Sequence, residues 1–424
     1  MTGASRRSLF RTAAAAATLA AARVALPGGA HAQGSGPETT KAQLGYIALT
    51  DAAPLIVAKE RGLFAKYGMP GVEVLKQASW GGTRDNLVLG GGGGGIDGAH
   101  LLTPMTYLIH LGKVVEGGTP VPMHILARLN TNGQAISVSK ALMPSGAKLN
   151  AAPLKAAFAA KEGSKAAITF RGGTHDLWMR YWLAAGGINP DADVGTIVVP
   201  PPRMVAEMKA GTMEVFCAGE PWNDQLVHLG MGYTACVTGE IWKDHPEKSL
   251  AMRADWVAKN PRAAVALTAA VIEAQQWAEK LENKEALAAM LGKREWLNVP
   301  ASDIAPRLLG NIDYGDGRKV EASPLRMKFW ADHASYPFQS HDLWFLTENI
   351  RWGVLSPYAD TAPAIAAVNR EDLWRAGAAM AGVAAADMPA GTSRGKETFF
   401  DGKVFDPAAP SAYLARLRIK KVGA

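Results

Sequence analysis

Several stretches of this 424-residue chain carry groups that could bind a small anion. The glycine run 90–95 offers backbone amides that no side chain blocks. It lacks the Lys-Ser/Thr that follows the glycines of a phosphate loop, and it is not a GxGxxG motif, so we predict a flexible tight loop. His175 follows Gly172 and Gly173 at a predicted helix start, where free amides and the helix dipole attract anions.

Other candidate residues have an ordinary structural explanation when each is taken singly. Gln134 follows a polar turn, and Trp80 lies in a Ser-Trp-Gly-Gly turn where packing is its usual role. Lys248 ends the polar segment 245–248, which is typical of a solvated surface. His100 has apolar neighbours in sequence, which favours a structural role.

Patterns of known catalytic and metal sites do not stand out in the sequence. There is no Ser-His-Asp order, GxSxG, HExxH or paired-carboxylate context. The two cysteines, Cys217 and Cys236, have no metal-site spacing, and Cys217 lies in an apolar predicted strand. We therefore predict no enzyme activity, no cofactor and no metal site, and we expect two buried, unpaired thiols.

The first 32 residues resemble an export signal. SRRSLFR at 5–11 matches a twin-arginine motif, an alanine-rich apolar segment follows, and Ala-His-Ala at 30–32 is a small-x-small cleavage site. The apolar run is too short for a membrane span, and Arg23 interrupts it. No cysteine follows it to carry a lipid anchor. We predict a twin-arginine signal peptide at 1–32 and a periplasmic location.

Composition and net charge indicate which classes of binding partner the chain does not recognise through charge alone. The chain is 48% hydrophobic and 20% charged, which is typical of a globular protein with two or three domains. The formal net charge is +7, but four arginines lie in the signal peptide, which has no acidic residue, so the mature chain carries +3. This charge is too small to indicate nucleic acid or membrane binding.

The stretch from Asp51 to Pro104 must position the candidate residues of the first half. We expect a strand at 44–49 and a helix that Asp51 caps and Gly68 ends. A strand at 72–75, a helix from Thr83, a strand at 96–102 and a helix after Pro104 follow. This alternation predicts a parallel sheet with covering helices, in which ligands bind at the carboxyl ends of strands.

A second strand-helix alternation begins near residue 166, after a polar turn at 130–134 between two predicted strands. Two such units joined by two crossings predict an α/β fold with two lobes and a hinged cleft between them. We assign 41–129 and 245–355 to the first lobe and 130–244 to the second. Residues 356–424 are expected to form an extension packing on the first lobe.

Longer motifs identify a family. LGYIALTDAAPLIVAKERGLFAKYG, QASWGGTRDNLVLG, LNTNGQAISVS, GGTHDLWMRYWLAAGGI, GEPWNDQ and GEIWKDHPEK resemble periplasmic nitrate-binding proteins of ABC importers. The bicarbonate-binding proteins are near relatives of these. The resemblance implies a type II periplasmic-binding-protein fold and nitrate as ligand. It also implies an ABC permease with its ATPase in the inner membrane as partners, and we expect a monomer.

The resemblance also implies the ligand-contacting residues, which are Trp80, Gln134, His175, Gly219 and Lys248. Nitrate is planar, singly charged and accepts hydrogen bonds without donating any. The indole, amide, imidazole and backbone N–H groups of the first four are all donors, and the lysine adds a positive charge. The chemistry of this set therefore suits nitrate.

Lys248 is the position that discriminates between ligands. Bicarbonate needs an acceptor for its own proton, and its binding proteins carry a glutamate there, which suits a metal co-ligand. A lysine repels that metal and favours nitrate, with nitrite as a second ligand. The alternatives are a binder of bicarbonate, a sulfonate or another oxyanion, a nitrate sensor with a regulatory partner, and a pyrimidine-synthase-like enzyme.

Overall fold

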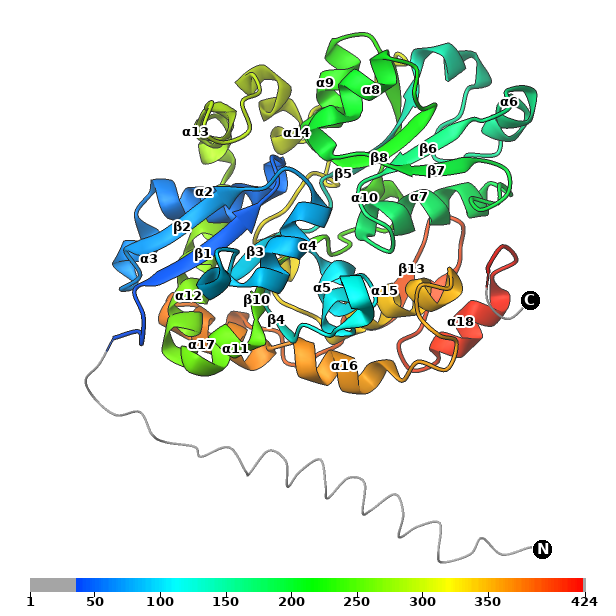
Figure 1. The fold of residues 1–424 in the computed structure, drawn as a ribbon. Coiled ribbons are helices and arrows are strands. Elements are labelled where there is room, and N and C mark those ends of the chain that lie inside the picture. The colour runs from blue at the N-terminus through cyan, green and yellow to red at the C-terminus, as the bar shows by residue number, and fades with distance from the viewer. Residues whose placement is uncertain (1–35, 422–424) are drawn as a thin grey trace, which may run out of the picture. The chain divides into compact units, whose positions relative to one another are not determined.

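The computed structural model describes residues 36–421, so the predicted signal peptide at 1–32 lies outside the described part. From Pro37 onward the chain forms one compact unit built on two five-stranded sheets (Figure 1). Within that part of the chain, no helix has both the length and the apolar character needed to cross a membrane.

The first sheet has the strand order β2-β1-β3-β10-β4. β1 pairs in parallel with β2 and β3, whereas β10 lies antiparallel between β3 and β4. The strands are β1 (Lys41–Tyr46), β2 (Gly71–Lys76), β3 (Gly98–Leu102), β4 (Met123–Arg128) and β10 (Lys248–Arg253). β3 is buried along its whole length, as expected of a strand covered on both faces.

The second sheet repeats this arrangement with the order β7-β6-β8-β5-β9. β6 pairs in parallel with β7 and β8, and β5 lies antiparallel between β8 and β9. The strands are β5 (Gln134–Ser139), β6 (Lys165–Ile168), β7 (Gly195–Val198), β8 (Val215–Gly219) and β9 (Gly232–Val237).

Two chain crossings join the sheets. The chain leaves β4 through residues 129–133 and enters β5, and it returns from β9 through 238–247 into β10. In each sheet the strand that follows a crossing is therefore the antiparallel one. Gln134 and Lys248 are the first residues of these two strands, so both stand directly at the passage between the sheets.

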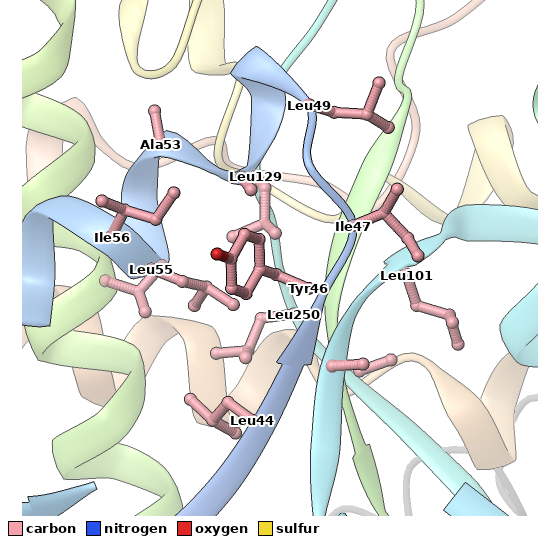
Figure 2. Packing of buried hydrophobic residues seen from close by; sticks show 14 of the residues in the cluster. Leu44, Tyr46, Ile47, Leu49, Ala53, Leu55, Ile56, Leu101, Leu129 and Leu250 are labelled. Atoms are coloured by element: carbon pink, nitrogen blue, oxygen red, sulfur yellow. The ribbon is translucent and has the colours of Figure 1, made fainter. Parts of the chain in front are cut away.

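Helices bury the apolar faces of the first sheet. Figure 2 shows Leu44 and Tyr46 of β1 near Leu55 and Ile56 of α2, with Leu250 of β10 between Tyr46 and Leu44 in this view. The long helix α12 packs on α2, α3, α17 and β4, while α4 and α5 pack on β3. Their bounds are α2 (Ala53–Glu60), α3 (Leu63–Lys66), α4 (Trp80–Leu89), α5 (Thr103–His110), α12 (Pro261–Glu279) and α17 (Glu371–Met380).

A second apolar cluster surrounds the second sheet and α7 (Thr174–Ala185). α8 (Met204–Lys209) and α9 (Trp222–His228) pack on β8, and α15 (Gln339–Arg351) contacts both α5 and α7. The other helices up to residue 309 are α6 (Leu154–Ala160), α10 (Thr238–Ile241), α11 (Ala254–Lys259), α13 (Lys284–Gly292) and α14 (Ala305–Leu309).

Two segments outside 130–244 reach the second sheet. The hairpin of β11 (Ile312–Asp313) and β12 (Lys319–Val320) packs on β5 and β9 through Ile312 and Tyr314. The tail after residue 356 divides: α16 (Thr361–Val368) and α17 pack on β4, whereas β13 (Glu397–Thr398), β14 (Val404–Phe405) and α18 (Pro410–Arg416) join the second apolar cluster. The tail thus contacts more than the first lobe, because its aromatic residues cover α7 and α15.

Several local expectations need correction. β1 ends at Tyr46 rather than residue 49, and the segment from Asp51 begins as a short 3-10 helix without a side-chain cap. The second helix starts at Trp80 rather than Thr83, because the Ser79 hydroxyl accepts the Gly82 amide at 3.0 Å. Cys217 and Cys236 are free and buried, which confirms the prediction of two unpaired thiols.

Candidate functional site

The candidate residues converge where the strands of the two sheets end. Gln134 pairs with Gly219 across β5 and β8, and Lys248 pairs with Leu102 at the carboxyl end of β3. Trp80 opens α4 directly after β2, and His175 lies in the first turn of α7 after β6. The strand-end geometry thus brings five separate segments together at one point, as expected for ligand sites of α/β sheets.

Lys248 lies at the centre of this cluster with its side chain completely buried. Its ammonium donates to Asp51 Oδ2 at 2.8 Å and to Glu247 Oε1 at 2.9 Å. Burial alone would lower the pKa of this lysine, but the two carboxylates outweigh burial and hold that pKa above its ordinary value. Lys248 therefore carries a full positive charge inside the protein, not on the solvated surface expected for this residue taken singly.

Asp51 is the acceptor that binds several of these donors. Besides Lys248, Gln134 Nε2 donates to Asp51 Oδ2 at 2.9 Å, and His100 Nε2 lies 2.6 Å from Asp51 Oδ1. Burial opposes ionisation of Asp51, but Lys248 and His100 outweigh it and lower the pKa of this carboxyl. The donors of the site are thus already arranged around an oxyanion.

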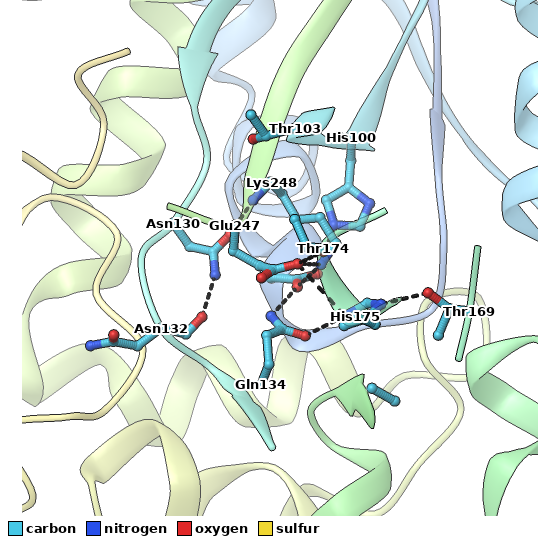
Figure 3. Close-up of polar contacts among 12 residues, drawn as sticks. His100, Thr103, Asn130, Asn132, Gln134, Thr169, Thr174, His175, Glu247 and Lys248 are labelled. Carbon is cyan, nitrogen blue, oxygen red and sulfur yellow. Dashed lines mark hydrogen bonds and ion pairs between the residues drawn. The ribbon is translucent and has the colours of Figure 1, made fainter. Parts of the chain in front are cut away.

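His175 and Gln134 form the part of the cluster that belongs to the second sheet (Figure 3). His175 Nε2 lies 2.7 Å from Gln134 Oε1, and the other ring nitrogen pairs with the Thr169 hydroxyl. Because the Gln134 amide donates to Asp51, its oxygen accepts from His175, and this fixes the histidine tautomer. Burial and then Lys248 lower the pKa of His175 well below its ordinary value, so the ring is neutral.

Gly219 allows close approach at this point. A Cβ atom there would lie 2.7 Å from Gln134 Oε1 and 3.3 Å from Asp51 Oδ2. The first distance is shorter than real Cβ contacts, so any larger residue would displace the Gln134 amide. Glycine at this position therefore keeps the space between the two sheets open for small groups.

Trp80 contributes a donor that the protein leaves unused. Its side chain is fully buried, and its Nε1–H finds no hydrogen-bond partner within residues 36–421. The Lys248 ammonium lies 5.8 Å from the centre of the indole ring, and the His100 ring lies 5.5 Å from it. A buried, unpaired N–H beside a cation is costly in isolation and suits an incoming acceptor.

Glu247 was not foreseen as a site residue. Its carboxylate is fully buried and accepts from Lys248, from Trp178 Nε1 at 2.9 Å and from the Thr174 hydroxyl. Burial raises the pKa of Glu247, and Lys248 only partly opposes this. The buried site therefore holds two carboxylates against one ammonium.

Asp51, His100 and Glu247 are the functional neighbours that sequence reasoning missed. Asp51 was assigned to a helix cap and His100 to the core, although both lie at the strand ends that the pattern had singled out. Glu247 directly precedes Lys248 in the sequence, but a negatively charged carboxylate is not expected at a site that binds an anion. In the described part of the chain, no group of three or more His, Cys, Asp or Glu side chains is placed to hold a metal ion.

Comparison with known proteins places this geometry in a family. Residues 35–292 match the sequence model of the NMT1-like family. The chain belongs to the NMT1-like family. A nitrate/nitrite binding protein NrtA from Nostoc is 59% identical over 389 residues, covering 91% of this chain and 87% of the relative. A bicarbonate-binding protein CmpA from Synechococcus elongatus is 44% identical over 397 residues, covering 91% and 88% of the two chains.

A solved structure of this family supports the architecture. The crystal structure of the periplasmic nitrate-binding protein NrtA from Synechocystis superposes with a TM-score of 0.90 at 58% identity, covering 91% of this chain and all of that one. The agreement confirms the predicted α/β, two-lobed periplasmic-binding-protein fold. The higher identity to the nitrate/nitrite binder than to the bicarbonate binder matches the preference that Lys248 predicted.

Proposed function

We propose that this protein captures nitrate, and nitrite as a second ligand, and delivers it to an ABC permease with its ATPase. One observation carries the proposal: the buried Lys248 ammonium lies beside the Trp80 N–H, which has no partner among residues 36–421, where Gln134, His175 and Gly219 meet. These are the five residues that we propose as ligand contacts. The relatives that bind nitrate or nitrite are also more similar to this chain than the bicarbonate binder is.

The chemistry of the pocket supports an oxyanion as ligand. Lys248 and Gln134 already donate to a carboxylate oxygen of Asp51, so the groups are oriented toward an acceptor that bears negative charge. Donors that are charged or buried form the stronger hydrogen bonds, each contributing roughly 1.5–3 kcal/mol when a charge is involved. A planar anion without a proton can use such donors fully.

We propose that the mature protein acts in the periplasm as a monomeric carrier without catalysis. The twin-arginine pattern at 5–11 and the similarity to the periplasmic nitrate-binding protein from Synechocystis support this location. Residues 41–129 with 245–355 would form one lobe and 130–244 the other, joined at the crossings 129–133 and 238–247. The tail from residue 356 and the hairpin 312–320 would then tie the lobes together on their outer side.

The proposal is tested by calorimetric titration of residues 33–424 with nitrate, nitrite and bicarbonate, with and without calcium. We expect nitrate to bind at micromolar or tighter affinity, about −8 kcal/mol or more, and calcium to have no effect. Calcium-dependent bicarbonate binding in place of nitrate binding would select the alternative ligand. Absence of heat with nitrate would remove the proposed function.

A further inference from the structure

Building on the proposed function, we propose that Glu247 takes up one proton from solvent when the anion binds, so that nitrate enters the pocket together with a proton. The observation behind this inference is the excess of buried carboxylates over buried cations around Lys248. The proton would be a second ligand of the site, and Glu247 would be the residue that binds it.

The charges in the pocket lead to this conclusion. Asp51 and Glu247 give two negative charges, and Lys248 gives one positive charge, with all three side chains fully buried. His100, His175 and His245 are neutral, because burial lowers the pKa of each ring, that of His245 to about 3. Addition of an anion would leave two uncompensated negative charges in a dry space, which is strongly unfavourable. One added proton keeps the net charge unchanged.

The partners of the two carboxylates decide which one takes the proton. Asp51 meets Lys248 Nζ and Gln134 Nε2, which donate to it, and His100 Nε2, which could accept only if the ring proton moved to Nδ1. That nitrogen is buried and has no hydrogen-bond partner among the described residues. A proton on Asp51 would therefore either point at another donor or leave a buried His100 Nδ1–H without a partner. Glu247 Oε1 instead meets the hydroxyl of Thr174, and a hydroxyl can accept as readily as it donates. A protonated Glu247 thus finds an acceptor after nothing more than rotation of that hydroxyl.

The other groups around Glu247 are less suited to hold the proton. Those that face it are Lys248 and His245 on its own segment, His175 on α7, Cys217 on β8, and Asp51 and His100 beyond the lysine. His175 Nε2 lies 3.6 Å from Glu247 Oε1, but a proton there would leave Glu247 ionised and create a second buried cation. Protonation of Glu247 gives the same net charge with fewer buried ions, which costs less desolvation.

The step involves a proton alone. A proton from bulk water bonds to one carboxylate oxygen of Glu247, giving a neutral carboxylic acid, and no bond between heavier atoms forms or breaks. Release of the anion returns the proton to solvent. By linkage, the dissociation constant for nitrate should rise toward tenfold per pH unit between the pKa of Glu247 in the nitrate-free protein and its higher pKa in the nitrate-bound protein.

The test is titration of the mature protein with nitrate at pH 8 in buffers of different ionisation enthalpy. The slope of measured heat against buffer ionisation enthalpy gives the protons taken up. We expect about one proton for the wild type and none for Glu247→Gln. Glu214→Gln, a buried glutamate at the opposite end of β8 that pairs with Lys161, should keep the wild-type slope.

The outcomes separate the two proposals. Lack of nitrate binding overturns the proposed function, whereas nitrate binding without buffer dependence overturns only the proton uptake. Uptake that persists in Glu247→Gln places the proton elsewhere and also overturns the inference. If that variant does not fold, infrared difference spectra of the wild type decide, because nitrate should add the C=O stretch of a protonated carboxyl, and its absence contradicts Glu247.

Discussion

Two buried clusters of this protein each combine one cation with two carboxylates, and they differ in what the cation does. Lys248 lies between Asp51 and Glu247, whereas Arg307 of α14 lies between Glu220 and Asp224. All three guanidinium nitrogens of Arg307 donate: to Asp224 at 3.2 Å, to Glu220 at 3.0 Å and to Thr234 at 2.9 Å. The arginine cluster thus fixes β9 and α9 to α14.

The lysine cluster is not closed in the same way. The ammonium has three donor positions and contacts two carboxylates, and the neighbouring Trp80 N–H has no partner among the described residues. The planar fork of arginine is suited to fixed, multiple bonds, whereas an ammonium can redirect its bonds. One cation with two carboxylates therefore stabilises the fold where every donor group has a partner. The same combination prepares a binding site where one donor group has no partner.

The largest expected effect is on stability, from removal of the structural cation. Arg307→Met should lower the free energy of unfolding at neutral pH by about 3–5 kcal/mol, because Glu220 and Asp224 would remain buried without their partner. Denaturant unfolding measures the loss. Arg203→Met, at an exposed i,i+4 pair with Glu207, should change stability by less than about 1 kcal/mol. Equal effects of the two variants would contradict a structural role for Arg307.

Next in size is the pH dependence that Glu220 adds to the arginine cluster. Burial outweighs Arg307 and raises the pKa of Glu220 from 4.5 to about 7. Because this folded pKa is raised, the stability contribution is complete below pH 4.5 and is lost as pH rises to about 7, at up to about 1.4 kcal/mol per pH unit. Unfolding of wild type and Glu220→Gln across this window should show a steeper loss of stability with pH in the wild type than in the variant.

Removal of the binding cation should lower nitrate affinity, and it should also lower the free energy of unfolding, because Asp51 and Glu247 would lose their buried partner. Lys248→Met should weaken nitrate binding by about 10- to 100-fold, since a charge-assisted bond contributes roughly 1.5–3 kcal/mol. Calorimetry gives the change. Lys284→Met removes another buried lysine, whose ammonium bonds Ala278 O at 2.6 Å, and should leave nitrate affinity unchanged. An unaltered affinity in Lys248→Met would contradict the assignment of this lysine.

The smallest effect should come from the unused donor. Trp80→Phe keeps an aromatic ring but removes the N–H, so we expect nitrate affinity to fall about fivefold, near 1 kcal/mol, with no loss of stability. Trp182→Phe is the matched opposite, because its N–H already donates to Lys148 O at 3.1 Å. It should cost about 1 kcal/mol of stability and leave affinity unchanged. Thermal unfolding and calorimetry together show whether the two variants separate in this way.

The sequence was informative about the fold where periodic patterns and turn residues agreed. The alternation of strands and helices predicted two sheets, and the polar turn at 130–134 predicted a crossing. Element boundaries were less certain, since pairing with neighbours decides where a strand ends: β1 stops at Tyr46 although apolar residues continue to Leu49. The position of the tail after residue 356 was harder to predict. Its contact with α7 depends on Phe399, Phe405 and Tyr413, which are far from α7 in sequence.

The candidate site, unlike the fold, could not be predicted from local sequence patterns. Its five proposed contacts came from a family resemblance, since Gln134 or Lys248 taken singly looks like an ordinary polar residue. Asp51 and Glu247 could not be foreseen, because a carboxylate at an anion site makes sense only once its distance to Lys248 is known. Local patterns describe elements well, whereas buried charge balance depends on segments almost 200 residues apart.

The position of Gln134 and Lys248 at the first residue after each crossing has a mechanical consequence. A rotation of one sheet against the other would have to bend the crossings 129–133 and 238–247, and each crossing leads directly into a residue that we propose as a ligand contact. Recognition and shape change then share the same few backbone bonds, so no relay through the body of either sheet is required. A fluorophore placed far from the pocket, across the mouth between the sheets, should report occupancy directly.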